Sequence, residues 1–289
     1  MSADVFYNPH TMAELQTALS AMPEDSYVVA GCTDFLAKRN GKYWHAGALV
    51  SVADIEEMKQ IARLPGKLSI GAACVHRQIA EHPDVRQWFP GLADACGDVG
   101  SPQIRNRGTI GGSLGNSSPA GDMLPALLVL EASVVTFDRE GRFRSVPLND
   151  FVQPNGKTIL QKGEVLARID LPLPAKNRIS AFSKLGERAY VTIAKINTAI
   201  SLEVTEGVIT RPLVSLGAVA RRAFFSADGA AALEGKPLHE ETFEGLAQVL
   251  SQEIANAIPT RESMPYKRDA IRGVVDNLRL LLEDRAAGL

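Results

Sequence analysis

Apolar and polar residues alternate with helical spacing near both ends of the chain. At the start, Thr11–Glu14 forms a capping box, and apolar residues recur on one face from Met12 to Met22, so we expect a helix there. Two later stretches repeat this spacing and predict helices over residues 240–257 and 267–285. Short apolar runs predict strands over residues 27–30, 49–52 and 68–72. The opening fifty or so residues therefore read as a small α/β unit.

The middle of the chain mixes short helices with paired strands. We expect helical segments over residues 76–81, 84–95 and 123–130, with Trp88 and Phe89 in the core. Hairpins are expected where strands 134–137 and 143–146, and strands 196–204 and 208–219, flank turn residues. Pro172–Pro174 is the best candidate for a domain boundary. Hairpin strands with helices packed on them predict an α+β protein.

A glycine-rich stretch from Gly100 to Pro125 holds the most concentrated candidate chemistry. Its glycines let the backbone approach a ligand closely, and the hydroxyl and amide side chains between them suit phosphate or ribose oxygens. Its carboxylate, Asp122, either caps the following helix or accepts hydrogen bonds from ligand hydroxyls. A plain surface loop is an equally good interpretation of one glycine cluster. The stretch is neither a Walker A loop nor a good G-x-G-x-x-G dinucleotide fingerprint.

A second loop favours a ligand site over a plain surface loop. The predicted strand at residues 27–30 leads into Gly31-Cys32-Thr33-Asp34 and then into a helix start at Phe35. A strand, a tight turn and a helix start direct backbone N–H groups and a helix dipole toward one spot, which favours an anion. Two such loops in one domain predict a ligand with more than one phosphate.

Composition narrows the class of protein without naming an activity. The 289 residues carry Lys+Arg 31 against Asp+Glu 33, a net charge of −2, so we expect neither nucleic acid nor a membrane surface as a partner. No transmembrane run or signal pattern is evident, and we expect a cytoplasmic protein. Cys32, Cys74 and Cys96 are widely spaced, which argues against disulfides, a zinc site or a cluster held by this chain. We expect no metal site.

Five stretches, in order, resemble the FAD-binding subunit or domain of the molybdenum hydroxylases, a family that includes the flavin part of xanthine dehydrogenase and the medium subunit of carbon monoxide dehydrogenase. Residues 29–34 resemble the family's A-G-G-T-D/N loop. Residues 101–113, S-P-Q-I-R-N-R-G-T-I-G-G-S, closely resemble its S-x-Q-I-R-N-x-A-T-I-G-G-N signature. Residues 117–122 resemble A-S-P-x-x-D, and residues 182–188 resemble the F-x-K-x-x-x-R strand. Tyr266-Lys267-Arg268 begins the family's last helix.

The resemblance implies a two-subdomain FAD-binding fold over residues 1–173, divided at about residue 55, and a C-terminal α+β domain over residues 174–289 with an antiparallel sheet and helices. It implies FAD as the cofactor. Carried over by position, the implied FAD contacts are Val29, Ala30, Gly31, Cys32, Thr33, Asp34, Phe35, Val99, Thr109, Ile110, Gly111, Gly112, Ser113, Asn116, Asp122, Leu166, Lys184 and Ile193. The first seven would wrap the pyrophosphate, and Ile193 would cover one flavin face.

Three positions depart from the family pattern. Cys32 replaces a glycine, so the turn must accept a Cβ, and Ser113 replaces an asparagine. Val99 stands where some relatives have an aromatic residue that stacks on the cofactor. Other roles stay open for two residues, since Lys184 suits a surface strand and Asp122 suits a helix cap. Arg105 and Arg107 are equally well explained as loop anchors, phosphate partners or subunit contacts.

The implied function is electron transfer within a larger complex, with no catalytic side chain in this chain. A [2Fe-2S] iron–sulfur subunit would receive electrons from a molybdopterin-binding large subunit and deliver them to FAD. The final acceptor would be NAD⁺ or another oxidant. The alternatives are a stand-alone flavin oxidoreductase of the same broad fold and a non-catalytic assembly subunit that has lost FAD.

Overall fold

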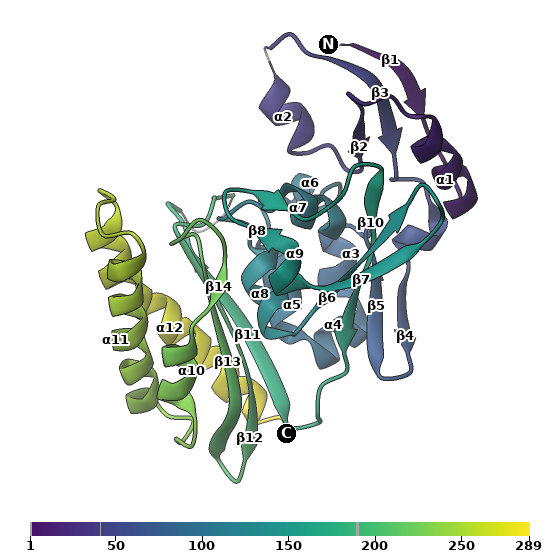
Figure 1. Ribbon diagram of the computed structural model, residues 1–289. Helices are drawn as coiled ribbons and strands as arrows, with labels where there is room; N and C mark the ends of the chain where they lie inside the picture. The colour runs from purple at the N-terminus through teal and green to yellow at the C-terminus, as the bar shows by residue number, and fades with distance from the viewer. Residues whose placement is uncertain (1, 41, 189–190) are drawn as a thin grey trace.

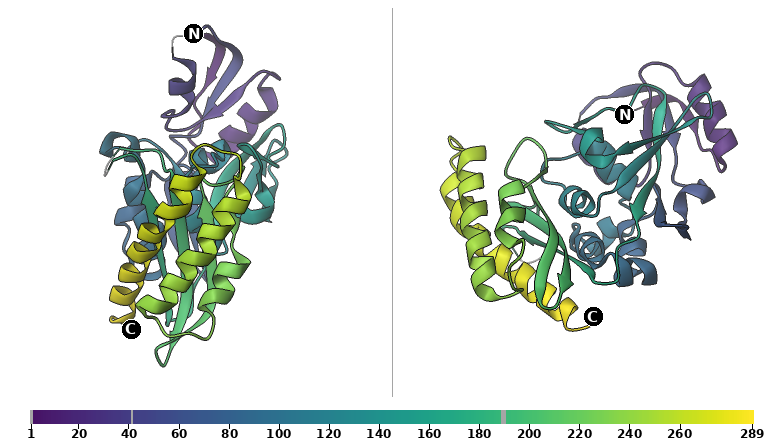
Figure 2. Two further views of the ribbon diagram at one scale, coloured as in Figure 1. Left: turned by 90° about the vertical axis from the view of Figure 1, so that its left-hand side faces the viewer. Right: turned by 60° about the horizontal axis from the view of Figure 1, so that its bottom comes forward.

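The computed structural model describes residues 2–40, 42–188 and 191–289 of the chain. Figure 1 shows three bodies: a small N-terminal unit at the top, a middle unit beneath it, and a C-terminal layer of sheet and helices at one side. The left view of Figure 2 shows the N-terminal unit standing above the other two. The division of residues 1–173 into two subdomains at about residue 55 stays a prediction.

The N-terminal unit is a three-stranded parallel sheet with two helices. The helix that the capping box predicts, α1, is confirmed. The sheet order is β1-β3-β2, and the elements are β1 (Ser2–Tyr7), α1 (Met12–Ala21), β2 (Tyr27–Val29), α2 (Phe35–Arg39) and β3 (His45–Ser51). The Thr11 hydroxyl accepts a hydrogen bond from the Glu14 N–H at 3.2 Å, so Thr11 caps α1. Because β2 is an edge strand, Tyr27 and Val28 are exposed, and the expected strand is only partly buried.

The middle unit is built on a five-stranded antiparallel sheet in the order β4-β5-β10-β6-β7. Its strands are β4 (Ile61–Leu64), β5 (Lys67–Gly71), β6 (Ser133–Asp138), β7 (Phe143–Pro147) and β10 (Glu164–Pro172), with a small pair β8 (Val152–Gln153) and β9 (Lys157–Thr158). Its helices are the 3₁₀ helix η1 (Glu56–Lys59), α3 (His76–Glu81), α4 (Pro83–Trp88), α5 (Pro90–Asp98), α6 (Pro102–Arg105), α7 (Ile110–Asn116), α8 (Met123–Val129) and α9 (Leu148–Phe151).

Two sequence-based expectations for this unit need correction. The single helix expected over residues 84–95 is two helices, α4 and α5, which meet at Phe89 because Pro90 starts the second one. The glycine-rich stretch is not one long loop but contains α6 and α7. Ser101 and Thr109 cap these helices through their hydroxyls, so the small polar residues that resembled loop chemistry also start helices.

The C-terminal domain is a four-stranded antiparallel sheet, β11-β12-β13-β14, covered on one face by helices. Its elements are β11 (Arg178–Leu185), β12 (Ile196–Thr205), β13 (Val208–Gly217), β14 (Phe224–Phe225), α10 (Ala227–Leu233), α11 (Glu240–Ala257) and α12 (Met264–Ala286). The other face of the sheet packs on α5 and α8 of the middle unit. The two long helices and the hairpin expected from the sequence are confirmed.

Apolar burial supports two cores that meet at this junction. One core fills the N-terminal and middle units, and the other fills the space between the C-terminal sheet and α11 and α12. Phe182, Ala199 and Ala223 come from the C-terminal domain but pack in the first core, so the junction is itself apolar and closely packed. The boundary at residue 173 stays a prediction.

Candidate functional site

The two glycine loops meet in space. A Cβ on Gly31 would lie 1.7 Å from the carbonyl oxygen of Arg107, and a Cβ on Gly108 would lie 3.4 Å from the Thr33 hydroxyl. The backbone of the first loop therefore rests directly on the backbone that precedes α7. Only glycine permits this approach at position 31. The contact joins the N-terminal unit to the middle unit and brings together two of the predicted sites.

The first loop presents backbone donors that the protein leaves unused. Across the described residues, no hydrogen bond uses the backbone N–H of Gly31, Cys32, Thr33 or Asp34. Cys32 has a left-handed backbone, with φ of 59°, and alternation between right- and left-handed residues turns successive N–H groups toward one point. All four residues are partly or fully exposed, so a ligand can reach their donors. Four such donors in succession at a junction between two units make a candidate anion site.

The second loop, by contrast, uses its N–H groups within the protein. The Ile110 N–H donates to the Cys74 carbonyl at 3.0 Å, and the Gly111 N–H donates to the Ala72 carbonyl at 2.9 Å. The Gly112 N–H donates to the Thr109 hydroxyl at 3.0 Å. A ligand therefore meets the face of α7 rather than free amides. That face carries Gly112, Gly115 and Asn116, which lie on one side of a helix, and both glycines are exposed.

A buried histidine that sequence reasoning missed supports the second loop. The Nε2 atom of His76 lies 3.0 Å from the Ser113 hydroxyl, and the His76 side chain is almost fully buried. Burial, aided by the Arg105 guanidinium, lowers the pKa of His76 to about 4. The ring is therefore neutral near pH 7. No local signal in the sequence distinguishes this residue from other helix-starting residues, because its partner is distant in the chain.

Lys38 is a second residue that the sequence analysis did not single out. Its ammonium lies 2.8 Å from the Asp34 carboxylate and 2.6 Å from the Asn116 amide oxygen. Asp34 and Asn116 are both predicted FAD contacts, one in each unit, so Lys38 bridges the units at the cleft. The spacing of four residues between Asp34 and Lys38 signals their ion pair in the sequence. The contact with Asn116 has no such signal.

A buried ion pair closes the other side of the site. The Lys184 ammonium lies 2.7 Å from the Asp122 carboxylate, and their side chains are 7% and 10% exposed. Asn197 on β12 donates to the second Asp122 oxygen at 3.1 Å. Lys184 is thus no surface lysine. Asp122 makes no helix-capping hydrogen bond, so it is no simple cap either. The pair joins the C-terminal domain to the middle unit.

Burial disfavours the charged form of Asp122 beside the glycine stretch. Burial raises the pKa of Asp122, while Lys184 and Asn197 oppose the rise and the Asp98 carboxylate adds to it. The neighbouring Ser117 is fully buried, and its hydroxyl has no partner in the part of the chain that the structure describes. Buried polar atoms normally have partners. The segment of residues 117–122 therefore holds a buried polar group without a partner in the described part of the chain.

The apolar residues predicted to contact FAD differ in position. Leu166 is buried in β10 beneath α7, where a Cβ on Gly115 would lie 3.8 Å from its side chain. Ile193 is 79% exposed and so is free to cover a ligand. The Phe35 ring packs edge-on against Trp44, with centroids 5.4 Å apart, and the Arg39 guanidinium lies 3.9 Å from the Phe35 ring centre. The Phe35 side chain thus packs within its own unit.

The remaining predicted residues fall around the same junction. Val29 is buried at the end of β2, and Ala30 follows it at the start of the first loop. Val99 is partly buried at the end of α5, and its carbonyl accepts a hydrogen bond from Arg105 at 3.1 Å. Arg105 also donates to the Gly100 carbonyl at 3.2 Å, so its role as a loop anchor is observed. Arg107 is exposed.

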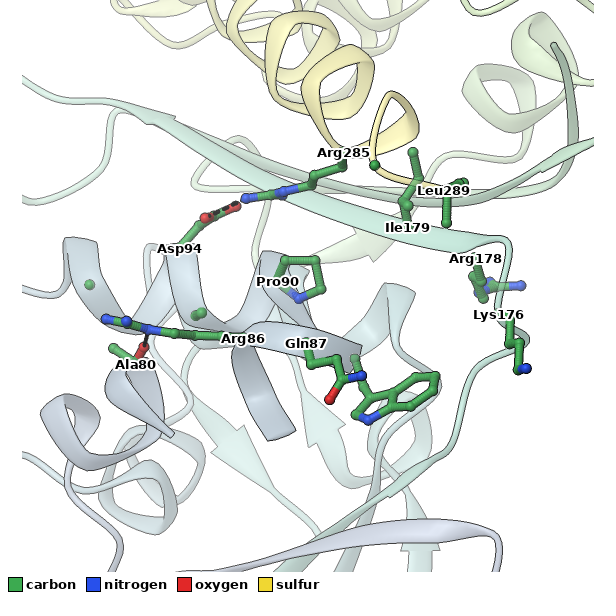
Figure 3. A pocket seen from close by; sticks show the side chains of 14 residues that line it. Ala80, Arg86, Gln87, Pro90, Asp94, Lys176, Arg178, Ile179, Arg285 and Leu289 are labelled. Carbon is green, nitrogen blue, oxygen red and sulfur yellow. Dashed lines mark hydrogen bonds and ion pairs between the residues drawn. The ribbon is translucent and has the colours of Figure 1, made fainter. Parts of the chain in front are cut away.

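A large groove lies elsewhere. It measures about 830 Å³ and runs between α4 and α5 on one side and β11 and α12 on the other. Figure 3 shows Asp94 and Arg285 pointing toward each other across it, and their charged groups are 2.7 Å apart. Arg178 in this groove and Lys184 at the ion pair lie toward opposite ends of β11, about 20 Å apart in an extended strand. None of the predicted FAD contacts lines the groove.

Comparison with known families matches both parts of the chain. Residues 2–174 match the family described as the FAD binding domain in molybdopterin dehydrogenase, and residues 181–280 match the CO dehydrogenase flavoprotein C-terminal domain. The chain is 30% identical to the nicotinate dehydrogenase FAD-subunit of Eubacterium barkeri, over 98% of this chain and 97% of that protein. It is 26% identical to the carbon monoxide dehydrogenase medium chain of Hydrogenophaga pseudoflava, over 91% of each.

Solved structures agree with the fold described above. A chain of quinoline 2-oxidoreductase from Pseudomonas putida 86 superposes with a TM-score of 0.87 at 26% identity, covering 99% of this chain and 98% of that one. A chain of carbon monoxide dehydrogenase from Hydrogenophaga pseudoflava superposes with a TM-score of 0.85 at 25% identity, covering 96% of each. Over the residues described, no helix combines the length and apolar character needed to cross a membrane.

Proposed function

Because the chain belongs to the family of FAD-binding subunits of the molybdenum hydroxylases, we propose that it passes electrons from a [2Fe-2S] partner subunit to NAD⁺ or another acceptor. A molybdopterin-binding large subunit would supply those electrons by oxidising the substrate. The substrate pocket would lie in that subunit. The chain itself is an FAD-dependent oxidoreductase subunit, and what it contributes is the cofactor cleft.

The residues of the cleft fit FAD. The four unused N–H groups of the first loop suit a diphosphate, since backbone donors bind phosphate oxygens without side-chain charge. The glycine face of α7 leaves room for a ligand to lie against the backbone. Asn116 and Asp122 would offer polar atoms to ribityl hydroxyls, and the exposed Ile193 would cover the flavin ring. Lys184 would hold Asp122 in place through their ion pair.

Electron transfer through a flavin needs no acid–base pair from the protein. When bound, FAD supplies the redox chemistry, because the flavin ring accepts and releases electrons. The chain's residues bind the cofactor, orient it and exclude water from one side. The predicted contacts therefore divide into phosphate binding by the first loop, support by α7, and polar contact from Asp122, with none that acts as a nucleophile.

The cysteines of this chain do not suit an iron–sulfur cluster, so the proposed electron transfer needs partner subunits. Its three cysteines are unpaired. Cys74 and Cys96 are buried, and burial raises the pKa of both thiols, that of Cys74 to about 12. Such thiols remain protonated and do not suit cluster ligation. The iron–sulfur centre would therefore belong to another chain. Free thiols also fit a reducing compartment, and we propose that the complex is cytoplasmic.

The observation that carries the proposal is the run of four unused N–H groups beside the segment that precedes α7. These donors suit phosphate oxygens, and an assembly subunit that had lost FAD would have no ligand for them. A stand-alone oxidoreductase would keep them, so the cleft alone does not separate that alternative. The family relationship to FAD-subunits and medium chains favours the multi-subunit reading.

The test uses the complex purified through a tag on this chain. We expect one releasable FAD per chain, and we expect substrate-dependent NAD⁺ reduction, or reduction of another added acceptor, to disappear when FAD is stripped and to return when it is restored. Iron–sulfur reduction by substrate should survive FAD removal, because it occurs upstream. If FAD removal left acceptor reduction intact, or if the chain alone oxidised substrate, the electron-transfer proposal would be wrong.

A further inference from the structure

Lys38 stands at the place where the two units face each other across the cleft. Its ammonium is within hydrogen-bonding distance of the Asp34 carboxylate, at 2.8 Å, and of the Asn116 amide oxygen, at 2.6 Å. Asp34 follows the unused N–H groups of the first loop, and Asn116 ends the glycine face of α7. A group that binds to either partner therefore lies within reach of this ammonium. Lys38 is 58% exposed, so a ligand entering from solvent can meet it.

The negative charge of Asp34 would oppose a diphosphate at this place, and the Lys38 ammonium offsets that charge. Asp34 carries a negative charge beside the four N–H groups, and the diphosphate of FAD would bring further negative charge to the same place. Like charges within a few ångströms repel each other. An ammonium has three donors. Two of those of Lys38 reach Asp34 and Asn116, so the ammonium would offset the carboxylate and have one donor left for a phosphate oxygen.

We propose that Lys38 is an additional FAD-binding residue that pairs with the diphosphate and neutralises Asp34. This inference rests on the proposed function, since it assumes that FAD occupies the cleft. It adds a charged side chain to a phosphate site otherwise made of backbone N–H groups. The consequence is selectivity for flavin ligands that carry a diphosphate over riboflavin, which has none.

The structure offers a matched control for the test. Lys162 pairs with Glu24 at 2.8 Å and is 55% exposed, so it resembles Lys38 in distance and exposure. Like Lys38, it joins the middle unit to the N-terminal unit. None of the predicted cofactor contacts is its partner. A Lys162→Met variant therefore removes the same charge and the same kind of bridge without touching the cleft.

The experiment titrates the flavin-stripped chain with FAD and with riboflavin, at low and moderate salt. In Lys38→Met we expect the FAD dissociation constant to rise about tenfold, as for loss of one charge-assisted hydrogen bond, and to depend less on salt. Riboflavin affinity should not change. Lys38→Arg should recover most of the FAD affinity, and Lys162→Met should bind FAD as the wild type does.

The outcomes separate the two proposals. If wild-type chain binds no FAD, the proposed function fails before Lys38 is tested. If wild type binds FAD but Lys38→Met binds FAD equally well, the role of Lys38 is wrong while the function stands. If Lys38→Met lowers FAD and riboflavin affinity by the same factor, the residue shapes the cleft and does not bind phosphate, which also overturns the inference.

Discussion

The two glycine loops at the junction of the N-terminal and middle units use their backbone N–H groups in different ways. The first, over residues 31–34, leaves its backbone N–H groups unpaired, and its second residue adopts a left-handed backbone. The second, over residues 109–113, starts a helix and spends its N–H groups on the chain's own carbonyl and hydroxyl oxygens. Glycine serves ligand approach in one loop and close internal packing in the other.

A glycine motif therefore does not by itself indicate free backbone N–H groups for a ligand. In the second loop, a Cβ on Gly111 would lie 2.6 Å from the Ala72 side chain, so this glycine lets α7 pack against the strand end. In the first loop, Gly31 lets two backbones touch. We therefore expect substitutions in the second loop to affect stability first, and substitutions in the first loop to affect FAD affinity first.

The largest effect should come from the histidine under the second loop. The pKa of His76 is about 4 in the folded chain and about 6.5 when unfolded. The unfolded chain thus binds a proton below pH 6.5 that the folded chain refuses, so stability is lost as pH falls from 6.5 to 4. The loss is about 3 kcal/mol. We expect His76→Gln to remove it, measured as a flatter pH dependence of the unfolding free energy than in wild type.

The other four histidines remain in the His76→Gln variant, so the difference between the two pH profiles isolates His76. Parallel profiles between pH 7 and pH 4 would contradict the burial argument. They would mean that His76 is reached by solvent and that the second loop is less closely packed than described.

Gly111→Ala tests the packing of the second loop. The added methyl would overlap Ala72, and overpacking of this kind costs about 1–3 kcal/mol. Chemical denaturation should report this loss, while the FAD affinity of the folded variant should change by less than about threefold. A variant of normal stability that binds FAD poorly would reverse the distinction between the loops.

Gly31→Ala tests the first loop. The methyl would lie 1.7 Å from the Arg107 carbonyl oxygen, so the loop must move away from α7. Because the clash is with backbone, we expect a loss of stability together with an increase of at least about tenfold in the FAD dissociation constant of the folded variant, or about 1.4 kcal/mol. Flavin fluorescence titration measures the affinity. Unchanged FAD affinity would show that the first loop does not bind the phosphates.

Cys32→Gly should have the smallest effect. A non-glycine residue at a φ of 59° is strained, and glycine relieves that strain but loses more entropy on folding. We expect a net change below about 1 kcal/mol in the unfolding free energy and normal FAD affinity. Cys32→Val is the companion variant, since a β-branched side chain resists this backbone. It should be the less stable of the two, and equal stability would argue against the left-handed turn.

Much of the fold could be predicted from the sequence because the patterns were local. The capping box marked the start of α1, and the apolar stripes located α11 and α12. The small β1 strand and the pairing of distant strands carried no comparable signal. The helices inside the glycine stretch were missed because serine and threonine caps resemble loop residues until their hydrogen bonds are seen.

The site was predicted in part, for a similar reason. The motifs located the two loops, Asp122 and Lys184, but the partners that hold them were not visible. Asn197 meets Asp122 across 75 residues of sequence, and Lys38 meets Asn116 across 78. Such contacts depend on the packing of whole units. The buried His76 likewise gained its role from the fold and not from its neighbours in sequence.

The most direct test of the central claim is amide hydrogen exchange of the wild-type chain with and without FAD. If the first loop binds the phosphates, FAD addition should slow exchange at the N–H groups of Gly31, Cys32, Thr33 and Asp34, because these donors gain a partner. The N–H groups of Ile110 and Gly111 should exchange slowly in both states, since they are already bonded. Protection confined to the second loop, with no change in the first, would contradict the account.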